Sequence, residues 1–463
     1  MATVVSYTAR TRRSLQALLL VFALVLGLGA FALQSLGRTG ELPSDLVPVA
    51  IGAAVCALAL QVVVSIRAPF ADPAILPIVV LLNLLGLTAI ATYDSAKLAY
   101  QDVHSHYAER QMIWTVVGII LACTVIVLMK DHRILRRYTW ISAVLGGILL
   151  ILPAVPGIGL SVNGSQIWIY VAGFSFQPAE LAKICFAVFF AGYLVSRRDT
   201  LALAGPKVLG IQLPRWSDFG PIIVAWAFSL AVLVWETDLG TSLLFFGLFV
   251  VMLYVATDRL SWLVIGAIMF APPALLAITQ VNRVRVRLTC WLDPLSSANF
   301  DRCGQINQGL FGMANGGLTG AGLGDGRVNL VPFGHSDFIY TTWSEEVGLV
   351  GAFGLLLLFL LLVQRALRTA VGISDGFGTL LSGGLAFTIA LQVFVVVGGV
   401  TRVIPLTGLT LPFLAAGGSS LVCNWIIIAL LVRLSDAARR PTGRPVAPPI
   451  PPSPRRSRTE VPA

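Results

Sequence analysis

Residues 346–364 read EVGLVGAFGLLLLFLLLVQ, and the stretch Leu355–Val363 within them contains no polar side chain. An apolar run of this kind lacks the alternation of a half-buried strand and the polar face of a surface helix. Runs of roughly 18–22 such residues are long enough to cross a hydrocarbon core of ~30 Å as a helix. The stretch therefore predicts a membrane-spanning helix.

The composition extends this reading to the whole chain. Of 463 residues, 57% are hydrophobic and 12% are charged, and the mean hydropathy is +0.85. These values exclude an ordinary water-soluble surface. A transmembrane barrel would show segments of ~10 alternating residues, which are not found here. The net charge of +10 comes mainly from Lys and Arg between apolar runs or in the tail, which indicates membrane topology rather than nucleic-acid binding.

Similar runs predict an all-α polytopic bundle of about twelve spans, with approximate boundaries. We place them at 14–36, 47–66, 74–95, 112–129, 138–157, 178–196, 219–235, 240–257, 260–279, 346–364, 378–399 and 409–433. Short Arg- and Lys-rich loops then fall on one side, which the positive-inside rule assigns to the cytoplasm together with both termini. The first run is too long for a signal-peptide core and is expected to be retained. The loop 280–345 lies outside, and the Pro- and Arg-rich tail 434–463 is expected to be disordered, with possible contact to anionic lipid.

Two cysteines differ from the other four because they lie in the long outer loop. Because an oxidising compartment allows disulfides, Cys290 and Cys303 can form one there. The alternative, with equal weight, is that both thiols stay free. The remaining cysteines fall inside predicted spans, where a thiol usually behaves as a small apolar residue. No cysteine or histidine spacing resembles a zinc site.

Glu180 and Lys183 open a predicted span in the motif FQPAELAK. Three residues apart, they share a helix face, and each costs ~2.5–3.5 kcal/mol to place in a membrane. That cost predicts a polar cavity or a partner. The plainer alternative makes Glu180 a first-turn acid favoured by the helix dipole and Lys183 a snorkelling side chain.

Asp238 lies in the motif ETDLGTS, a tight outer turn before another inward span. It is expected at a similar depth to Lys183 on a parallel helix, and a buried pair would hold both charges at the lowest cost. The alternative is that Asp238 is simply an N-cap residue.

The end of the long loop places three carboxylates near one interface. Asp337 follows His335 in the stretch GHSDFIY, and Glu345 and Glu346 open the next span. A plain turn with a solvated first helical turn would give the same pattern. The glycines at 316–326 precede them and predict either a flexible turn or a backbone nest for phosphate, and Gly417–Ser420 predicts close helix packing or a helix opened toward a cavity.

Several motifs occur in the order found in the SEDS family of shape, elongation, division and sporulation proteins, typified by RodA and FtsW. The chain resembles that family from about residue 74 to 433, through FQPAELAK, ETDLGTS, GGLTGAGLG, HSDFIYTTWSEEVGLVG and TRVIPLTGLTLPFLAAGGSS. The resemblance implies a peptidoglycan glycosyltransferase that joins lipid II outside the bacterial cytoplasmic membrane. It also implies a class B penicillin-binding protein as partner.

The family core has ten spans, so the resemblance makes 1–70 an N-terminal segment with two additional helices, of a form associated with actinobacterial RodA-like proteins, and 71–433 the core. It also makes Asp337 the essential outer carboxylate, Lys183 and Asp238 a pair in a central cavity, and Glu180 a residue lining that cavity. One departure is the Gln166-Ile167-Trp168 stretch, where the family usually has a basic residue before Trp.

Glycosyl transfer needs a base for the acceptor hydroxyl, a role that suits Asp337. It also needs positive charge for the departing diphosphate, for which Arg283, Arg285 and Arg287 are candidates, with a divalent cation such as Mg²⁺ or Mn²⁺ as a further expectation. Anchoring of the loop at lipid headgroups explains the arginines equally well. A transporter of a lipid-linked precursor and a non-catalytic scaffold are the alternative functions.

Overall fold

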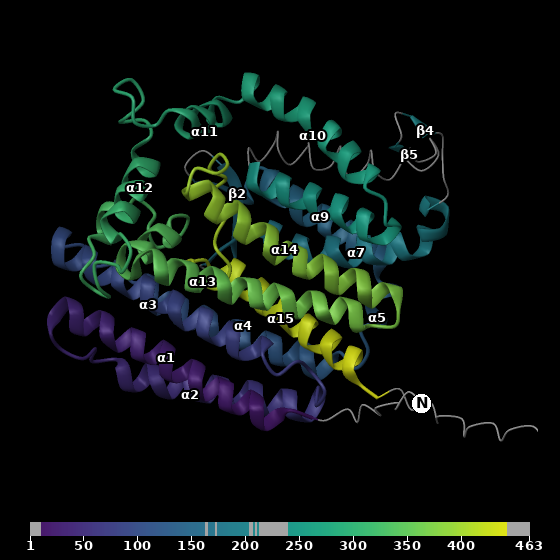
Figure 1. Cartoon of the computed structure of the whole chain (residues 1–463), viewed down its shortest axis with the longest axis horizontal. Helices are drawn as coiled ribbons and strands as arrows, with labels where there is room; N and C mark the ends of the chain where they lie inside the picture. The colour runs from purple at the N-terminus through teal and green to yellow at the C-terminus, as the bar shows by residue number, and fades with distance from the viewer. Residues whose placement is uncertain are drawn as a thin grey trace, which may run out of the picture.

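The structure, a computed structural model, describes residues 11–162, 165–171, 174–202, 207–208, 211–212 and 239–441. Within these ranges it is a bundle of long helices that run along one common direction (Figure 1). Ten of the described helices are long and apolar enough to cross a membrane. They are α1 (Arg13–Thr39), α2 (Leu46–Arg67), α3 (Ile75–Gln101), α4 (Tyr107–Leu128), α7 (Pro178–Ala202), α9 (Leu239–Thr257), α10 (Ser261–Gln280), α13 (Ile339–Gly372), α14 (Gly376–Val400) and α15 (Gly418–Arg439).

Shorter elements connect and cover the bundle. The helical ones are α5 (Ile134–Arg137), α6 (Thr139–Ile151), η1 (Leu152–Ala154), α11 (Asn282–Leu292), α12 (Gly304–Gly316) and η3 (Val328–Leu330). The strands are β1 (Gly159–Val162), β2 (Ser165–Val171), β3 (Phe174–Phe176), β4 (Lys207–Val208) and β5 (Ile211–Gln212). The first three form an antiparallel sheet in the order β1-β2-β3, with Leu160 opposite Trp168 and Tyr170 opposite Ser175.

The all-α membrane fold predicted from the sequence is confirmed. Each of the ten long helices overlaps one predicted span. The predicted span 138–157 is a shorter apolar helix, α6 with η1. The span predicted at 219–235 lies outside the described residues.

One predicted span is wrong at its outer end. The expected helix at 409–433 begins only at Gly418. The residues before it, 401–417, form a non-helical segment that enters the bundle, and Leu411, Phe413 and Leu414 within it are fully buried. Proline cannot supply a helical N–H, and Pro405 and Pro412 interrupt this stretch. Irregular backbone at membrane depth is tolerated where protein surrounds it or where it lines a cavity.

Helix α15 is the centre of the bundle, because 83% of its apolar window is buried, compared with 22% for α2 at the edge. It packs against α4, α7 and α13. Close approach depends on Gly418, where an added Cβ would lie 2.3 Å from the Trp114 ring. Gly418 at the start of α15 therefore serves close packing, one of the two roles expected for the glycines of this stretch.

The two ends of the bundle differ. Helix α1 begins and α15 ends at the same end, on the right of Figure 1, where the Arg-rich helix α5 also lies. The opposite end carries α11, α12 and the chain that leads into α13. From the charges of the loops, the positive-inside rule predicts that this end faces away from the cytoplasm.

Candidate active site

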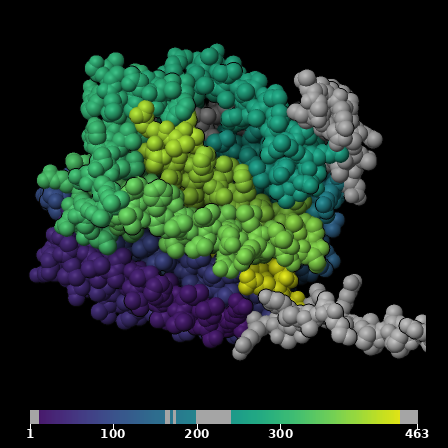
Figure 2. Space-filling model, in the orientation of Figure 1, coloured from purple at the N-terminus to yellow at the C-terminus, as the bar shows by residue number. Residues whose placement is uncertain are grey.

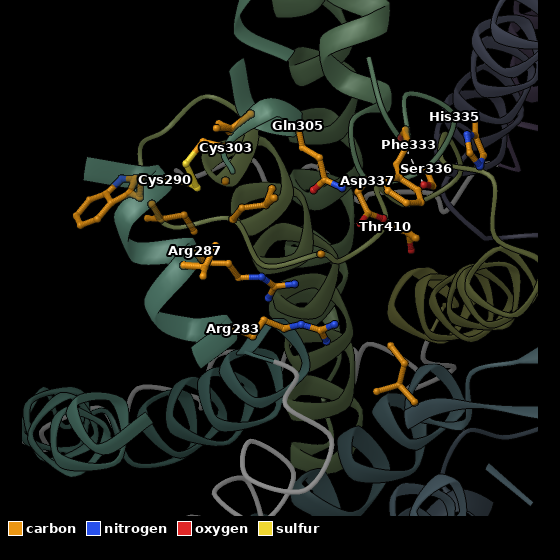
Figure 3. A pocket seen from close by; sticks show the side chains of 18 of the residues that line it. Arg283, Arg287, Cys290, Cys303, Gln305, Phe333, His335, Ser336, Asp337 and Thr410 are labelled. Atoms are coloured by element: carbon orange, nitrogen blue, oxygen red, sulfur yellow. Dashed lines mark hydrogen bonds between the residues drawn. A yellow bond between two sulfur atoms is a disulfide. The ribbon is translucent and has the colours of Figure 1, made fainter. Parts of the chain in front are cut away.

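A pocket of about 900 Å³ opens at the end of the bundle that carries α11 and α12. Its walls come from segments far apart in the sequence: strands β2 and β3, helices α11 and α12, the turn before α13, and the segment 401–417. Five of its charged side chains are Asp337, Arg283, Arg287, Arg302 and Arg402. Figure 3 shows Arg283 and Arg287 extending from α11 toward the side of the pocket where Asp337 lies.

The three arginines predicted to bind the diphosphate lie on α11, but on different faces of that helix. Arg283 and Arg287 are four residues apart, so they share one face, and both line the pocket. Arg285 lies on another face, is exposed, and donates to the carbonyl oxygens of Ile278 and Thr279 near the end of α10. Cationic side chains commonly cap helix C-termini in this way. The structure therefore does not bring Arg285 into the site.

Arg287 and Asp337 meet at Gly408. Arg287 Nη1 donates to the Thr407 carbonyl oxygen at 2.8 Å. A Cβ added to Gly408 would lie 3.0 Å from Arg287 Nη2 and 3.8 Å from Asp337 Oδ2. Gly408 has a φ of +81°, a backbone conformation that glycine adopts without steric cost. The glycine thus leaves room for the Asp337 carboxylate and the Arg287 guanidinium, which have opposite charges, to face the same space.

The turn that carries Asp337 is held on both sides. Phe338 is fully buried and packs where a Cβ on Gly309 of α12 would lie. His335 stacks on Tyr107 with ring centroids 3.8 Å apart and lies 4.9 Å from Tyr93. Its carbonyl oxygen accepts from the Ala416 N–H at 2.8 Å. Packing and backbone contacts on both flanks therefore fix the position of Asp337.

His335 is held in its neutral form. Burial, with a smaller contribution from the charge of Lys97, lowers the pKa of His335 to about 4. Desolvation disfavours the charged imidazolium, and a nearby cation acts in the same direction. At neutral pH this histidine therefore adds no charge beside Asp337.

Arg402 joins two walls of the pocket. Its guanidinium donates to the Trp291 carbonyl oxygen, through Nη2 at 2.9 Å and Nε at 3.1 Å, while Trp291 Nε1 donates back to the Arg402 carbonyl oxygen at 3.0 Å. Sequence analysis missed Arg402 and the exposed Arg302 as pocket residues. The disulfide position offered a signal for the second, because Arg302 adjoins Cys303.

Cys290 and Cys303 form a disulfide, one of the two states expected from their place in the predicted outer loop. The bond joins the last turns of α11 to the start of α12. Arg287 lies one helical turn before Cys290, and Arg302 immediately precedes Cys303. The cross-link therefore fixes two of the pocket's arginines relative to each other.

Glu180 and Lys183 are not among the residues that line the pocket. Both are buried on α7, and Lys183 Nζ is 2.5 Å from Glu180 Oε2 and donates to Gln392 Oε1 at 2.9 Å. Gln392 Nε2 in turn donates to the Thr410 carbonyl oxygen at 2.8 Å, and Thr410 lines the pocket. Glu180 is a buried partner of Lys183, and its predicted place in a central cavity stays a prediction. Asp238, expected to pair with Lys183, lies outside the described residues.

The glycine-rich strap, residues 316–326, already has carboxylate acceptors. Glu346 accepts from the N–H groups of Gly324 and Gly326, the latter at 3.0 Å, and Glu345 Oε1 accepts from the Arg327 N–H at 3.0 Å. The Glu346 carboxylate therefore occupies two of the strap amides that a phosphate nest would need, and Glu345 accepts from the residue that follows the strap. The interpretation of these glycines as a phosphate nest is wrong for Gly324 and Gly326.

Among the described residues, no three His, Cys, Asp or Glu side chains gather in a way that could hold a metal ion. In the pocket, Asp337 has arginines around it instead of further carboxylates. Hard divalent cations such as Mg²⁺ need several oxygen ligands. These residues alone do not form a site for the predicted Mg²⁺ or Mn²⁺, which stays a prediction.

Comparison with known proteins agrees with this architecture. The family model described as “Cell cycle protein”, which covers FtsW, RodA and SpoVE, matches residues 73–440. The peptidoglycan glycosyltransferase RodA of Mycobacterium tuberculosis is 44% identical over 435 residues, which is 93% of this chain and 92% of that protein. The chain belongs to the FtsW/RodA/SpoVE family.

Solved structures of the FtsW/RodA/SpoVE family share the fold. A chain of a peptidoglycan synthase complex, described as coordinating polymerization and crosslinking, matches with a TM-score of 0.63 and 26% identity, over 80% of this chain and 99% of that one. The rod shape determining protein RodA of Thermus thermophilus matches with a TM-score of 0.54 and 25% identity, over 79% and 96%. The M. tuberculosis relative covers more of this chain than either structure, and residues 13–67, which form α1 and α2, precede the family match.

Proposed function

We propose that this chain is a peptidoglycan glycosyltransferase that polymerises lipid II on the outer face of the bacterial cytoplasmic membrane, with both termini in the cytoplasm. The observation that carries the proposal is the meeting of Asp337 and Arg287 at Gly408, in a pocket that contains three further arginines. The names of the relatives support the same activity.

The chemistry assigns one role to each kind of side chain. The Asp337 carboxylate accepts the proton of the acceptor sugar hydroxyl as its oxygen bonds to the anomeric carbon of the donor. The bond from that carbon to the diphosphate oxygen breaks, and the guanidinium groups of Arg283 and Arg287 stabilise the negative charge that develops there. The products are a longer glycan, a lipid diphosphate with one more negative charge, and a protonated Asp337 that then releases its proton.

The geometry also favours an enzyme over the alternatives. A precursor transporter needs a polar path through the bundle, whereas Lys183 and Glu180 are paired within it and the pocket lies at one end. A scaffold needs no carboxylate and guanidinium that face one space, as Asp337 and Arg287 do. The synthase complex among the structural relatives supports a class B penicillin-binding protein as the cross-linking partner.

The deciding experiment measures polymer formation from purified lipid II in nanodiscs. We expect Asp337→Ala and Asp337→Asn to abolish glycan strands, because the second change keeps the shape and removes the basic oxygen. Asp301→Asn is the matched control, since Asp301 is an exposed carboxylate of the same outer region. Normal strands from Asp337→Asn would overturn the assignment, and lipid II translocation without polymer would favour the transporter.

Chelation by EDTA tests the predicted Mg²⁺ or Mn²⁺ requirement in the same assay.

A further inference from the structure

The outer end of α1 touches the glycine-rich strap backbone to backbone. A Cβ added to Gly37 would lie 2.1 Å from the Leu323 carbonyl oxygen, and a Cβ added to Gly324 would lie 2.1 Å from the Gln34 carbonyl oxygen. Two glycines on opposite sides of the contact therefore make this approach possible. In Figure 2 the segment that contains the strap lies directly on the N-terminal helices.

Arg38 strengthens the same contact. Its Nη2 donates to the Gly326 carbonyl oxygen at 2.9 Å. Its guanidinium lies 5.3 Å from the Tyr100 ring centre, and the guanidinium of Arg327 lies 5.3 Å from the same ring. The end of α1 thus holds the strap directly by this hydrogen bond. Tyr100 of α3 lies between Arg38 and Arg327 and makes a cation–π contact with each of them.

The strap in turn is bonded to the first turns of α13. The N–H groups of Ala321 and Gly322 donate to the carbonyl oxygens of Glu345 and Glu346, at 2.9 and 3.0 Å. The Glu346 carboxylate accepts from two strap amides on the same side. Strap and helix start are therefore one hydrogen-bonded unit.

The start of α13 needs such support, because the helix is broken nearby. Gly348 has φ 67° and ψ −172°, so residues 339–347 are not a rigid continuation of the membrane-spanning part. The strap fills this break, where a Cβ on Gly348 would lie 2.3 Å from Gly320 N. Asp337 lies two residues before this short helical segment.

We propose that the C-terminal end of α1 is a positioning element for the site: through Gly37 and Arg38 it fixes the strap, and through the strap it orients residues 339–347 and Asp337. This role goes beyond the family core, because α1 precedes the residues that the family model matches. The positioning role itself does not depend on the proposed function; only the kinetic test of it does.

The test compares two glycines of the same helix in the full-length protein. Gly37→Val places a side chain against the strap backbone, whereas a Cβ at position 29 would have no neighbouring atom within 4 Å. Gly29→Val is the control because it makes the same substitution in the same helix. We expect hydrogen exchange in 317–326 and 333–338 to be faster in Gly37→Val by about tenfold, and unchanged in Gly29→Val. Equal exchange in both variants would overturn the proposal, whatever their activity.

Kinetics with lipid II give a second, separate readout. A displaced Asp337 should lower kcat more than it raises KM, because the base acts in the transition state. Arg38→Ala is the variant to use if Gly37→Val does not fold, and Arg38→Lys should restore most of its activity by keeping a donor for Gly326. A failure of the wild-type protein to polymerise would count against the proposed function, while the exchange data would still decide the positioning role.

Discussion

Lys183 Nζ donates to Gln392 Oε1 at 2.9 Å while it contacts Glu180 Oε2 at 2.5 Å, so one buried cation is held by two different helices. Gln392 continues the chain of hydrogen bonds to Thr410 at the pocket. The buried ion pair is therefore connected to the candidate active site by a single side chain.

The ion pair should be strongly coupled. Lys183→Ala or Glu180→Ala leaves an uncompensated buried charge, which should destabilise the protein by ~3–5 kcal/mol. The double variant should lose less than the sum of the two, because neither charge then remains. Thermal unfolding of the four proteins in one detergent measures the coupling, and strictly additive losses would contradict a direct contact.

Gln392→Ala should reduce both stability and activity. The change removes the acceptor of Lys183 and the donor to the Thr410 carbonyl oxygen, and leaving buried polar groups unpaired costs ~1–3 kcal/mol. Gln364→Ala is the matched control because Gln364 is exposed on α13. Thermal unfolding and polymerisation rates measure both effects. Equal values for the two variants would mean that the hydrogen bonds of Gln392 contribute nothing to stability or activity.

The arginines of α11 provide a test of the pocket. Arg287→Ala should lower polymerisation by ~10²-fold, the usual effect of removing one preorganised donor to developing charge. Arg285→Ala, on another face of the same helix and outside the pocket, should change it little. Initial rates with saturating lipid II make the comparison, and equal losses would indicate that the Arg run acts by binding lipid headgroups.

Lowering the pH should reduce the stability of the folded protein, because His335 must then take up a proton. Its folded pKa of about 4 lies below the usual value of 6.5, so the unfolded chain binds more protons between these values. Stability is therefore complete above pH 6.5 and decreases as pH falls toward 4, by up to about 3 kcal/mol. Unfolding of wild type and His335→Phe across this range tests the assignment, because phenylalanine keeps a ring against Tyr107 but does not titrate. The same slope in both proteins would refute it.

Sequence analysis predicted the features that depend on a single helix, and it missed those that depend on contacts between distant segments. Apolar run length predicted ten of the described spans, and charges inside such runs identified Glu180 and Lys183. It could not find Arg402 or Gln392, because Arg402 bonds to Trp291 and Gln392 to Lys183, each more than 100 residues away, and packing brings these residues together. Helical spacing within α11 would have separated Arg285 from its neighbours, had a helix been expected there.

The disulfide should be present in the mature protein and should matter for activity. Thiol labelling without reductant should leave Cys290 and Cys303 unmodified, and labelling of both would contradict the bond. In the chain-entropy model a cross-link across 13 residues stabilises the native state by roughly 3 kcal/mol. Cys290→Ser with Cys303→Ser removes that constraint from α11, on which Arg283 and Arg287 lie.

The kinetic consequence separates this bond from a merely protective one. Without it, α11 keeps its contacts through Arg402 and Trp291 but is no longer tied to α12. The double serine variant should therefore still fold, with a higher KM for lipid II because the arginines that meet the diphosphate are less well placed. Cys56→Ser with Cys123→Ser is the control, since both thiols are free and lie within spans. An unchanged KM in the first variant would show that the disulfide stabilises the outer loop without positioning the arginines.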